Sequence, residues 1–353
     1  MSNLSSIVEV SESGIVVSNK GQKVLLDPRR ESKADVMFFS HAHSDHLMTT
    51  GKKDIAYARE VLASEATTRL ARVRGNALSQ ASCKDCFDGY NLIDTCHVLG
   101  SRGLLIDDQI YYTADISTRQ RGFMGSARIP RADILIVEST FGVPRYVFPP
   151  VYDVVHTTNK IIGEMFDRGV SVILMGYPLG KAQLLIQLFQ HWAPLYVHDS
   201  VEKINDVYRH FGIRLKEGTV ISNVKQNFLL KKSAPWLMIL PLGAARSGYV
   251  NTIKERYRAV TIGFSGWAMD KPYRFMMGLD YALPLSDHCD YKELVRLVLA
   301  SQARKVYTIH GFSAEFALSL RGMGIDAEPL RRRHKLQKSD NQIQKNSSLD
   351  YYF

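Results

Sequence analysis

Residues 40–46 constrain the fold more than any other part of this 353-residue sequence. They read Ser-His-Ala-His-Ser-Asp-His and follow an apolar run at residues 36–39 that predicts a buried strand. Desolvating three imidazoles and a carboxylate just past a strand end costs free energy unless they share a binding partner. Because nitrogen and carboxylate ligands together suit zinc or a similar first-row metal, the stretch predicts a metal site. The alternative is a solvated polar loop.

Length and composition fit a soluble globular protein with room for two domains. Hydrophobic residues make up 45% of the sequence and charged residues 23%, which are ordinary values. No apolar run is long enough to span a membrane, and residues 1–5 lack the features of a signal peptide. We therefore expect an intracellular protein, cytoplasmic or, in a eukaryote, nuclear. The formal charge of +10 favours a polyanionic partner.

The cysteines do not form a recognisable framework. Four cysteines are too few to staple a chain of this size with disulfides. Cys83 and Cys86 have the spacing of half a zinc knuckle, but no second pair completes it, so we expect reduced thiols.

Further ligand-type side chains follow other predicted strands. Carboxylates or imidazoles end or flank apolar runs at Asp27, His97, Asp115, Glu138 and His310. Taken singly, Asp27 could orient an imidazole or simply cap a turn, and a histidine such as His97 is more often a core or surface residue. As a group they describe one rim, where strand ends bring ligands to the same edge of a sheet.

Helix and strand patterns alternate over residues 152–260, which predicts a mainly parallel sheet covered by helices. A helical pattern also covers residues 59–73. Residues 176–181 read Gly-Tyr-Pro-Leu-Gly-Lys between a strand and a helix start. Backbone N–H groups beside Lys181 could hold a phosphate, or the segment could be a plain strand–helix turn. It is not a Walker A loop, because the spacing and the following Ser or Thr are missing.

These stretches resemble the β-CASP branch of the metallo-β-lactamase superfamily, nucleases in which a second domain is inserted into the metallo-β-lactamase core. The resemblance is to exonucleases associated with bacterial and archaeal DNA ligases and helicases, and more distantly to Artemis-type DNA repair nucleases and RNA 3′-end-processing nucleases. It rests on eight stretches in the family's order: residues 41–46, 97–101, 112–115, 138–142, 177–182, 263–267, 286–290 and 309–311. It implies an α/β fold: an αββα sandwich formed by residues 1–150 and 261–330, with an inserted β-CASP domain, a parallel sheet flanked by helices, at residues 151–260.

The resemblance also implies two divalent metal ions, with zinc expected first and manganese or magnesium as alternatives. His41, His43 and His97 would bind one ion. Asp45, His46 and His310 would bind the other. Asp115 would bridge the two ions, and Asp27 would support a ligand imidazole from behind.

Three catalytic residues follow from the same resemblance: Asp45, Glu138 and His288. Asp45 would act as a metal ligand. His288 would give a proton to the departing sugar oxygen, and Glu138 would hold its imidazole.

The substrate path would include Gly180, Lys181, Ser265 and Gly266. A pocket for a terminal 5′-phosphate at the Gly180–Lys181 turn would favour 5′→3′ exonuclease action.

Glu138 and His310 depart from the Artemis-type pattern, which has Asp and a small apolar residue, and match the RNA-processing members. The leading hypothesis is a DNA nuclease of DNA repair with 5′→3′ exonuclease activity, and with endonuclease activity as a further option. One alternative is an RNA-processing ribonuclease. Another is a non-catalytic nucleic-acid-binding scaffold, whose usual sign is the loss of metal ligands, and none is missing here.

Residues 331–353 are basic and polar without periodicity, which predicts a disordered tail. The tail ends in a pattern that resembles the sliding-clamp-binding box: Asn346, Leu349, Tyr352 and Phe353. A clamp is therefore a candidate partner beside the nucleic acid. The alternative is a tail that packs on its own domain.

Overall fold

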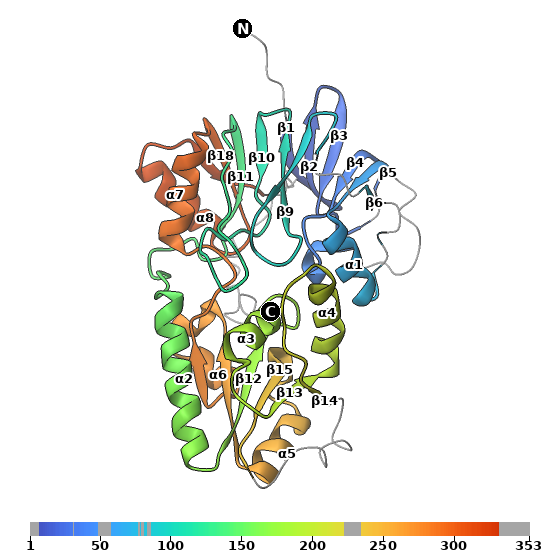
Figure 1. The fold of residues 1–353 in the computed structure, drawn as a ribbon. Helices are drawn as coiled ribbons and strands as arrows, with labels where there is room; N and C mark the ends of the chain where they lie inside the picture. The colour runs from blue at the N-terminus through green and yellow to red at the C-terminus, as the bar shows by residue number, and fades with distance from the viewer. Residues whose placement is uncertain are drawn as a thin grey trace, which may run out of the picture.

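The computed structural model describes residues 7–30, 32–48, 58–76, 78, 81–82, 86–221 and 234–331. These residues form three sheets, two in the upper part of Figure 1 and the third in the lower part. The tail after Arg331, with its clamp-binding pattern, lies outside the described residues, as does Cys83, so both expectations stay predictions. No helix in the described segments is long and apolar enough to cross a membrane.

The first sheet contains the strand that leads into the histidine stretch. Its strands, in order across the sheet, are β1 (Ile7–Ser11), β2 (Gly14–Asn19), β3 (Gln22–Leu26), β4 (Ala34–Phe38), β5 (Ala58–Leu62) and β6 (Ala81–Ser82). Lys20 and Gly21 join β2 to β3 with φ values of 47° and 79°, a turn geometry that matches the twist of a hairpin. β3 and β4 run parallel, so Asp27 and Ser40 leave the sheet at the same edge.

The helix predicted over residues 59–73 is only half right. Its first part is β5, which pairs in parallel with β4 and buries Val61 and Leu62 in the sheet. The helix itself, α1 (Glu65–Val73), begins after Ser64. The Ser64 hydroxyl accepts a hydrogen bond from the Thr67 N–H at 3.1 Å and so caps the helix.

The second sheet packs face to face with the first. Its strands, in order, are β19 (Ala327–Pro329), β18 (Lys305–Ile309), β11 (Ile134–Glu138), β10 (Ile110–Tyr112), β9 (Arg102–Ile106), β8 (Tyr90–Asp94) and β7 (Cys86–Phe87). Val24 and Phe38 of the first sheet share a buried cluster with Tyr112 and Ile136 of the second.

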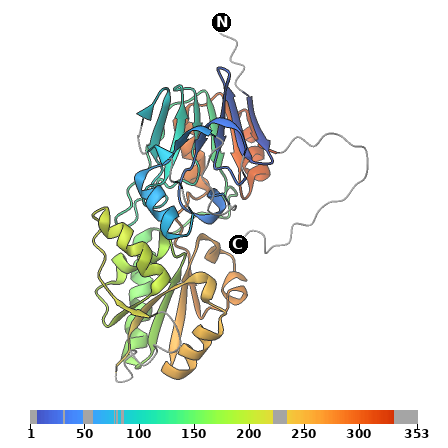
Figure 2. The same ribbon diagram turned by 90° about the vertical axis from the view of Figure 1, so that its right-hand side faces the viewer.

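Helices cover the outer faces of both sheets (Figures 1 and 2). α7 (Tyr291–Ser301) and α8 (Ser313–Gly322) pack on the second sheet, and α1 packs on the first. The two sheets and their helices therefore form the αββα sandwich that was expected.

The third sheet is parallel throughout. Its strands, in order, are β14 (Thr219–Ile221), β13 (Leu195–His198), β15 (Leu237–Pro241), β12 (Ser171–Gly176), β16 (Ala259–Phe264) and β17 (Tyr281–Leu283). One face carries α2 (Val151–Asp167), α3 (Lys181–Phe189) and α4 (Asp199–His210). The other carries α5 (Gly248–Tyr257) and the short α6 (Tyr273–Met276). This confirms the predicted parallel sheet flanked by helices.

The expected return to the sandwich at residue 261 falls inside β16. Both β16 and β17 pair within the third sheet, because β16 lies beside β12 and β17 extends that edge. The chain rejoins the second sheet with β18, beside β11. Strand pairing therefore moves the proposed end of the inserted domain from residue 260 to a point after Leu283.

Candidate metal centre

The strand ends of the first two sheets meet where the histidines lie. β4 leads to His41, β10 leads to Asp115 and β18 leads to His310. A short 3-10 turn, η1 (Ser44–His46), carries two further ligand-type residues, and His97 lies in the connection between β8 and β9. Residues far apart in the sequence therefore surround one centre.

Four side chains direct one atom each toward a common point: His41, His43, His97 and Asp115. Nδ1 of His43 lies 3.0 Å from Nε2 of His41 and 3.2 Å from Nε2 of His97. Oδ2 of Asp115 lies 3.4 Å from Nε2 of His41 and 3.5 Å from Nε2 of His97. Tetrahedral ligands about 2.1 Å from a zinc ion would lie about 3.4 Å from one another. The donor set therefore fits a first metal ion.

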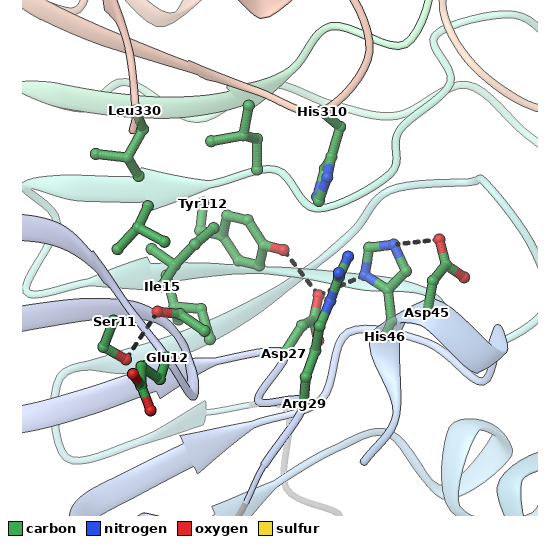
Figure 3. Close-up of a pocket in the computed structure, with 14 residues that line it drawn as sticks. Ser11, Glu12, Ile15, Asp27, Arg29, Asp45, His46, Tyr112, His310 and Leu330 are labelled. Atoms are coloured by element: carbon green, nitrogen blue, oxygen red, sulfur yellow. Dashed lines mark hydrogen bonds and ion pairs between the residues drawn. The ribbon is translucent and has the colours of Figure 1, made fainter. Parts of the chain in front are cut away.

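A second set of donors shares Asp115. Its Oδ2 lies 3.4 Å from Nε2 of His46, and that nitrogen lies 3.6 Å from Oδ2 of Asp45. The His310 ring is centred 5.6 Å from the His46 ring, and its Nε2 is buried without a hydrogen-bond partner among the residues that the structure describes. Figure 3 shows His46 between Asp27 and Asp45, with the His310 ring pointing toward them. Because a buried ring nitrogen normally has a partner, the unsatisfied His310 nitrogen fits a second metal ion.

Asp27 is the centre of the hydrogen bonds behind these ligands (Figure 3). Its carboxylate accepts from Nδ1 of His46 and from the Tyr112 hydroxyl, each at 2.7 Å. The Ser40 hydroxyl donates to Asp27 at 2.7 Å and lies 2.9 Å from Nδ1 of His41, where it accepts. Of the two readings of Asp27 in the sequence, the structure thus places it where it orients imidazoles.

Backbone carbonyls serve the other two histidines. Nε2 of His43 lies 3.2 Å from the carbonyl oxygen of Leu179, and Nδ1 of His97 lies 2.9 Å from that of Asp287. A neutral imidazole that donates through one nitrogen keeps a lone pair on the other. Burial and the neighbouring imidazoles hold the pKa of His41 well below its ordinary value, which keeps that ring neutral. Burial likewise lowers the pKa of His43 and His97, so the inner nitrogens of the first set are in the form that binds a metal.

His288 and Glu138 form a pair beside this centre. The His288 ring is centred 4.5 Å from the His97 ring, and its Nδ1 lies 3.0 Å from both carboxylate oxygens of Glu138. Burial opposes a charge on His288, but the carboxylates of Glu138 and Asp115 outweigh it and raise its pKa to about 9. The ring is therefore protonated at neutral pH, and Nε2 is left for another partner.

A cleft of about 620 Å³ opens over the histidines and is lined by three of the four expected substrate-path residues, Lys181, Ser265 and Gly266. Gly180 instead packs against Val98. Ser265 lies at the end of β16, where its hydroxyl caps the short 3-10 helix η4 (Gly266–Met269).

The environment of the Lys181 ammonium differs from the one expected of a phosphate ligand. Its side chain is 2% exposed, and its ammonium donates to the Leu285 carbonyl at 2.6 Å and to the Asp287 carboxylate at 2.8 Å. Burial outweighs the attraction of Asp287 and lowers the pKa of Lys181 to about 8. An ammonium committed to two buried acceptors is not available to a phosphate, so the role expected for Lys181 needs correction.

Sequence reasoning missed two residues that brace the site. The Asp287 carboxylate forms an ion pair with the Lys181 ammonium. Arg121 is fully buried, and its Nε lies 3.7 Å from the same carboxylate. Arg121 also donates to the carbonyls of Cys96 at 2.8 Å and His97 at 3.2 Å. The place of Asp287 beside His288 was a usable signal, whereas nothing in the sequence around Arg121 marks it.

Comparisons with known proteins add relatives of three kinds, although no family model matches the chain. A protein of Opitutus terrae named "Probable DNA ligase" is 33% identical over 85% of this chain and 29% of its own length. "Endoribonuclease YSH1" of Mycosarcoma maydis is 26% identical over 61% of this chain and 30% of its own length. The "RNase J-like protein" of Methanocaldococcus jannaschii is 20% identical over 88% of this chain and 93% of its own length.

The chain thus spans less than a third of the first two relatives, but nearly all of the third. Among solved structures, a protein of unknown function from Enterococcus faecalis V583 superposes with a TM-score of 0.58 at 13% identity. The match covers 88% of this chain and 94% of that one, and it shows a shared fold. With these relatives and with an αββα sandwich that gathers the family's histidines and carboxylates at one rim, the chain belongs to the β-CASP branch of the metallo-β-lactamase superfamily.

Proposed function

We propose that this chain is a metal-dependent nuclease that hydrolyses phosphodiester bonds. The observation that supports this best is the arrangement of the four histidines around Asp115, namely His41, His43, His46 and His97. Each has one nitrogen on an outer acceptor and the other facing the centre. Relatives named as an endoribonuclease and as an RNase J-like protein agree with the activity.

Two metal ions fit the donors. His41, His43 and His97 would hold the first and Asp45, His46 and His310 the second, with Asp115 shared. A donor set rich in imidazole favours zinc, with manganese or magnesium as alternatives. Bound divalent ions would supply positive charge beside the scissile phosphate and lower the pKa of water.

His288 supplies the proton for the leaving group in this proposal. A water oxygen forms the new bond to phosphorus and gives up a proton to solvent. As the old P–O bond breaks, its electron pair stays on the sugar oxygen, which takes the proton from Nε2 of His288. Glu138 keeps that ring charged and fixed, since it faces Nδ1 at 3.0 Å. The Ile116 N–H donates to Glu138 at 2.8 Å and holds the carboxylate in place.

The cleft above the histidines is the proposed path of the substrate. Gly266 lies on its wall, and a Cβ there would lie 2.4 Å from Cζ of Phe141, so only glycine fits. Tyr177 also lines the cleft and is 41% exposed, which suits contact with a base. The net charge of +10 on the whole chain would favour a polyanionic substrate.

DNA is the substrate that we propose first, with attack from 5′ ends in DNA repair and endonuclease action as a further option. The choice of DNA rests on the relative named "Probable DNA ligase", which matches 85% of the chain. The 5′ polarity comes from the family resemblance alone, because the Lys181 ammonium is committed to Leu285 and Asp287. RNA is the second candidate, because the relatives named "Endoribonuclease YSH1" and "RNase J-like protein" cover 61% and 88% of the chain.

The test is digestion of matched single-stranded and duplex DNA and RNA, each with 5′-phosphate or 5′-hydroxyl ends. We expect cleavage of DNA from phosphorylated 5′ ends, its loss on chelation and its return when a divalent metal is added. His288→Ala should abolish cleavage, whereas the matched control His191→Ala, at an exposed histidine after α3, should not. Cleavage of RNA alone would overturn the choice of DNA. Binding without cleavage of any substrate would indicate a scaffold and refute the nuclease.

A further inference from the structure

Residues 179–181, here called the 179–181 turn, join β12 to the start of α3 and so belong to the third sheet. They nevertheless contact the metal centre of the first two sheets. We propose that this turn, anchored by Lys181, is a positioning element that fixes the outer hydrogen bonds of His43 and His97. The affinity of the first metal site then depends on how the third sheet is seated against the sandwich. This inference rests on the metal sites of the proposed function.

The first contact is the backbone of Leu179. Its carbonyl oxygen lies 3.2 Å from Nε2 of His43 and is the acceptor that leaves Nδ1 of His43 as the inner nitrogen. The Leu179 side chain is fully buried in the same cluster as Ala42, which lies between His41 and His43, and Leu47, which follows the histidine stretch. Packing of this side chain therefore fixes the position of the carbonyl relative to His43.

The second contact is Gly180. It has a φ of 90°, and a Cβ built there would lie 2.4 Å from Cγ1 of Val98, the residue after His97. The Gly180 N–H donates to the Gln183 side chain at 2.7 Å, which closes the turn onto α3. Only glycine lets the turn come this close to the side chain of Val98, next to His97.

The third contact runs through Lys181. Its ammonium donates to the Leu285 carbonyl at 2.6 Å and to the Asp287 carboxylate at 2.8 Å. The carbonyl of Asp287 in turn lies 2.9 Å from Nδ1 of His97 and sets which nitrogen of that ring faces the metal site. The same loop continues directly into His288, so one lysine fixes the segment that serves both rings.

Burying the Lys181–Asp287 ion pair costs desolvation free energy, which its contacts must offset. A buried ammonium loses its hydration and is tolerated only with close, well-placed partners. Arg121 also faces Asp287, at 3.7 Å, but it lies within the sandwich. Lys181 is therefore the cation that ties this loop to the third sheet. Loss of Lys181 would leave the Leu285 carbonyl without that donor and weaken the hold on Asp287.

The experiment measures zinc affinity of the full chain, by competition with a chromophoric chelator, beside thermal unfolding of the metal-free protein. Losing an outer partner of a metal ligand typically weakens binding by about 10- to 100-fold. We expect a loss of this size at the first site in Lys181→Met and a smaller one in Asp287→Asn, which keeps the backbone carbonyl. Lys181→Met should reduce zinc affinity by a smaller factor in the Asp287→Asn protein than in the wild type, because both substitutions act through the same ion pair.

Lys254→Met is the matched control. It removes a lysine that pairs with Asp280 at 2.7 Å on the third sheet, away from the histidines, and should leave zinc affinity unchanged. Wild-type zinc affinity in a folded Lys181→Met protein would overturn the inference, as would an equal loss in the control. If Lys181→Met does not fold, unchanged affinity in Asp287→Asn would overturn it. A wild-type protein that binds no metal would instead refute the proposed function.

Discussion

Nδ1 of His288 faces the carboxylate of Glu138 and lies 3.0 Å from each of its oxygens, so both oxygens of one buried anion contact the same ring nitrogen. Glu138 has no exposed surface and is itself fixed by the Ile116 N–H and the Thr140 hydroxyl. A buried carboxylate is costly unless it is paired with a cation. The pair therefore fixes the orientation of the ring and also keeps it charged.

Glu138→Gln should move the alkaline limit of activity to lower pH. The charge of Glu138 raises the pKa of His288 to about 9, so His288 remains an acid well above neutrality. The amide removes that charge and lowers the pKa, and the proton is then lost earlier as the pH rises. The measurement is kcat against pH, with Glu202→Gln on α4 as the control. An alkaline limb that stays in place would mean that His288 is not the proton donor.

Asp27→Asn should weaken metal binding by about 10- to 100-fold, because Asp27 accepts from His46, Ser40 and Tyr112. An amide can offer its NH₂ group to these partners, which favours the wrong form of the His46 ring. Calorimetric titration of the metal-free protein with zinc measures the change. Asp35→Asn removes a carboxylate that accepts only from a backbone N–H at Lys23 in the contacts described, and serves as the control. Equal affinities in the two variants would contradict the role of Asp27.

His310→Ala should reduce the bound metal without emptying the first site. Nε2 of His310 has no hydrogen-bond partner among the described residues, and its ring is centred 5.6 Å from that of His46 in the second set of donors. The first set, around His43, does not include it. Elemental analysis of the purified protein should therefore find about half of the wild-type metal content, on the two-ion proposal. Unchanged metal content would show that His310 is not a ligand.

Part of the histidine cluster could be predicted from the sequence because some of its members closely follow an apolar run. A buried strand fixes where the next side chain emerges from the sheet. His41 after β4 and His310 after β18 could therefore be predicted from the sequence. The parallel sheet expected within residues 152–260 could be predicted for the same reason, from alternating periods. Residues 261–283 were assigned to the sandwich instead, although β16 and β17 pair within the third sheet, since pairing partners leave no local signal.

Apart from Asp27, the supports behind the ligands could not be predicted in this way. Two of them are the backbone carbonyls of Leu179 and Asp287, and a carbonyl carries no residue identity. Lys181 was misread because a Gly-Lys pair at a helix start looks the same whether the ammonium meets a phosphate or turns inward to Asp287. That choice is made by burial, which depends on the packing of distant segments.

Tyr177→Ala should weaken binding of a single-stranded oligonucleotide while leaving metal content unchanged. Tyr177 and His288 both line the cleft, and the Tyr177 side chain is 41% exposed. Stacking of one base on such a ring contributes about 1–3 kcal/mol, so Kd should rise by about 5- to 150-fold. Tyr177→Phe keeps the ring and should bind nearly as well as the wild type. Tyr152, on α2 and 75% exposed, is absent from the lining of the cleft, and its change to alanine should leave Kd unchanged. Equal losses in the two alanine variants would show that exposed aromatic surface in general, rather than the ring in the cleft, holds the nucleic acid.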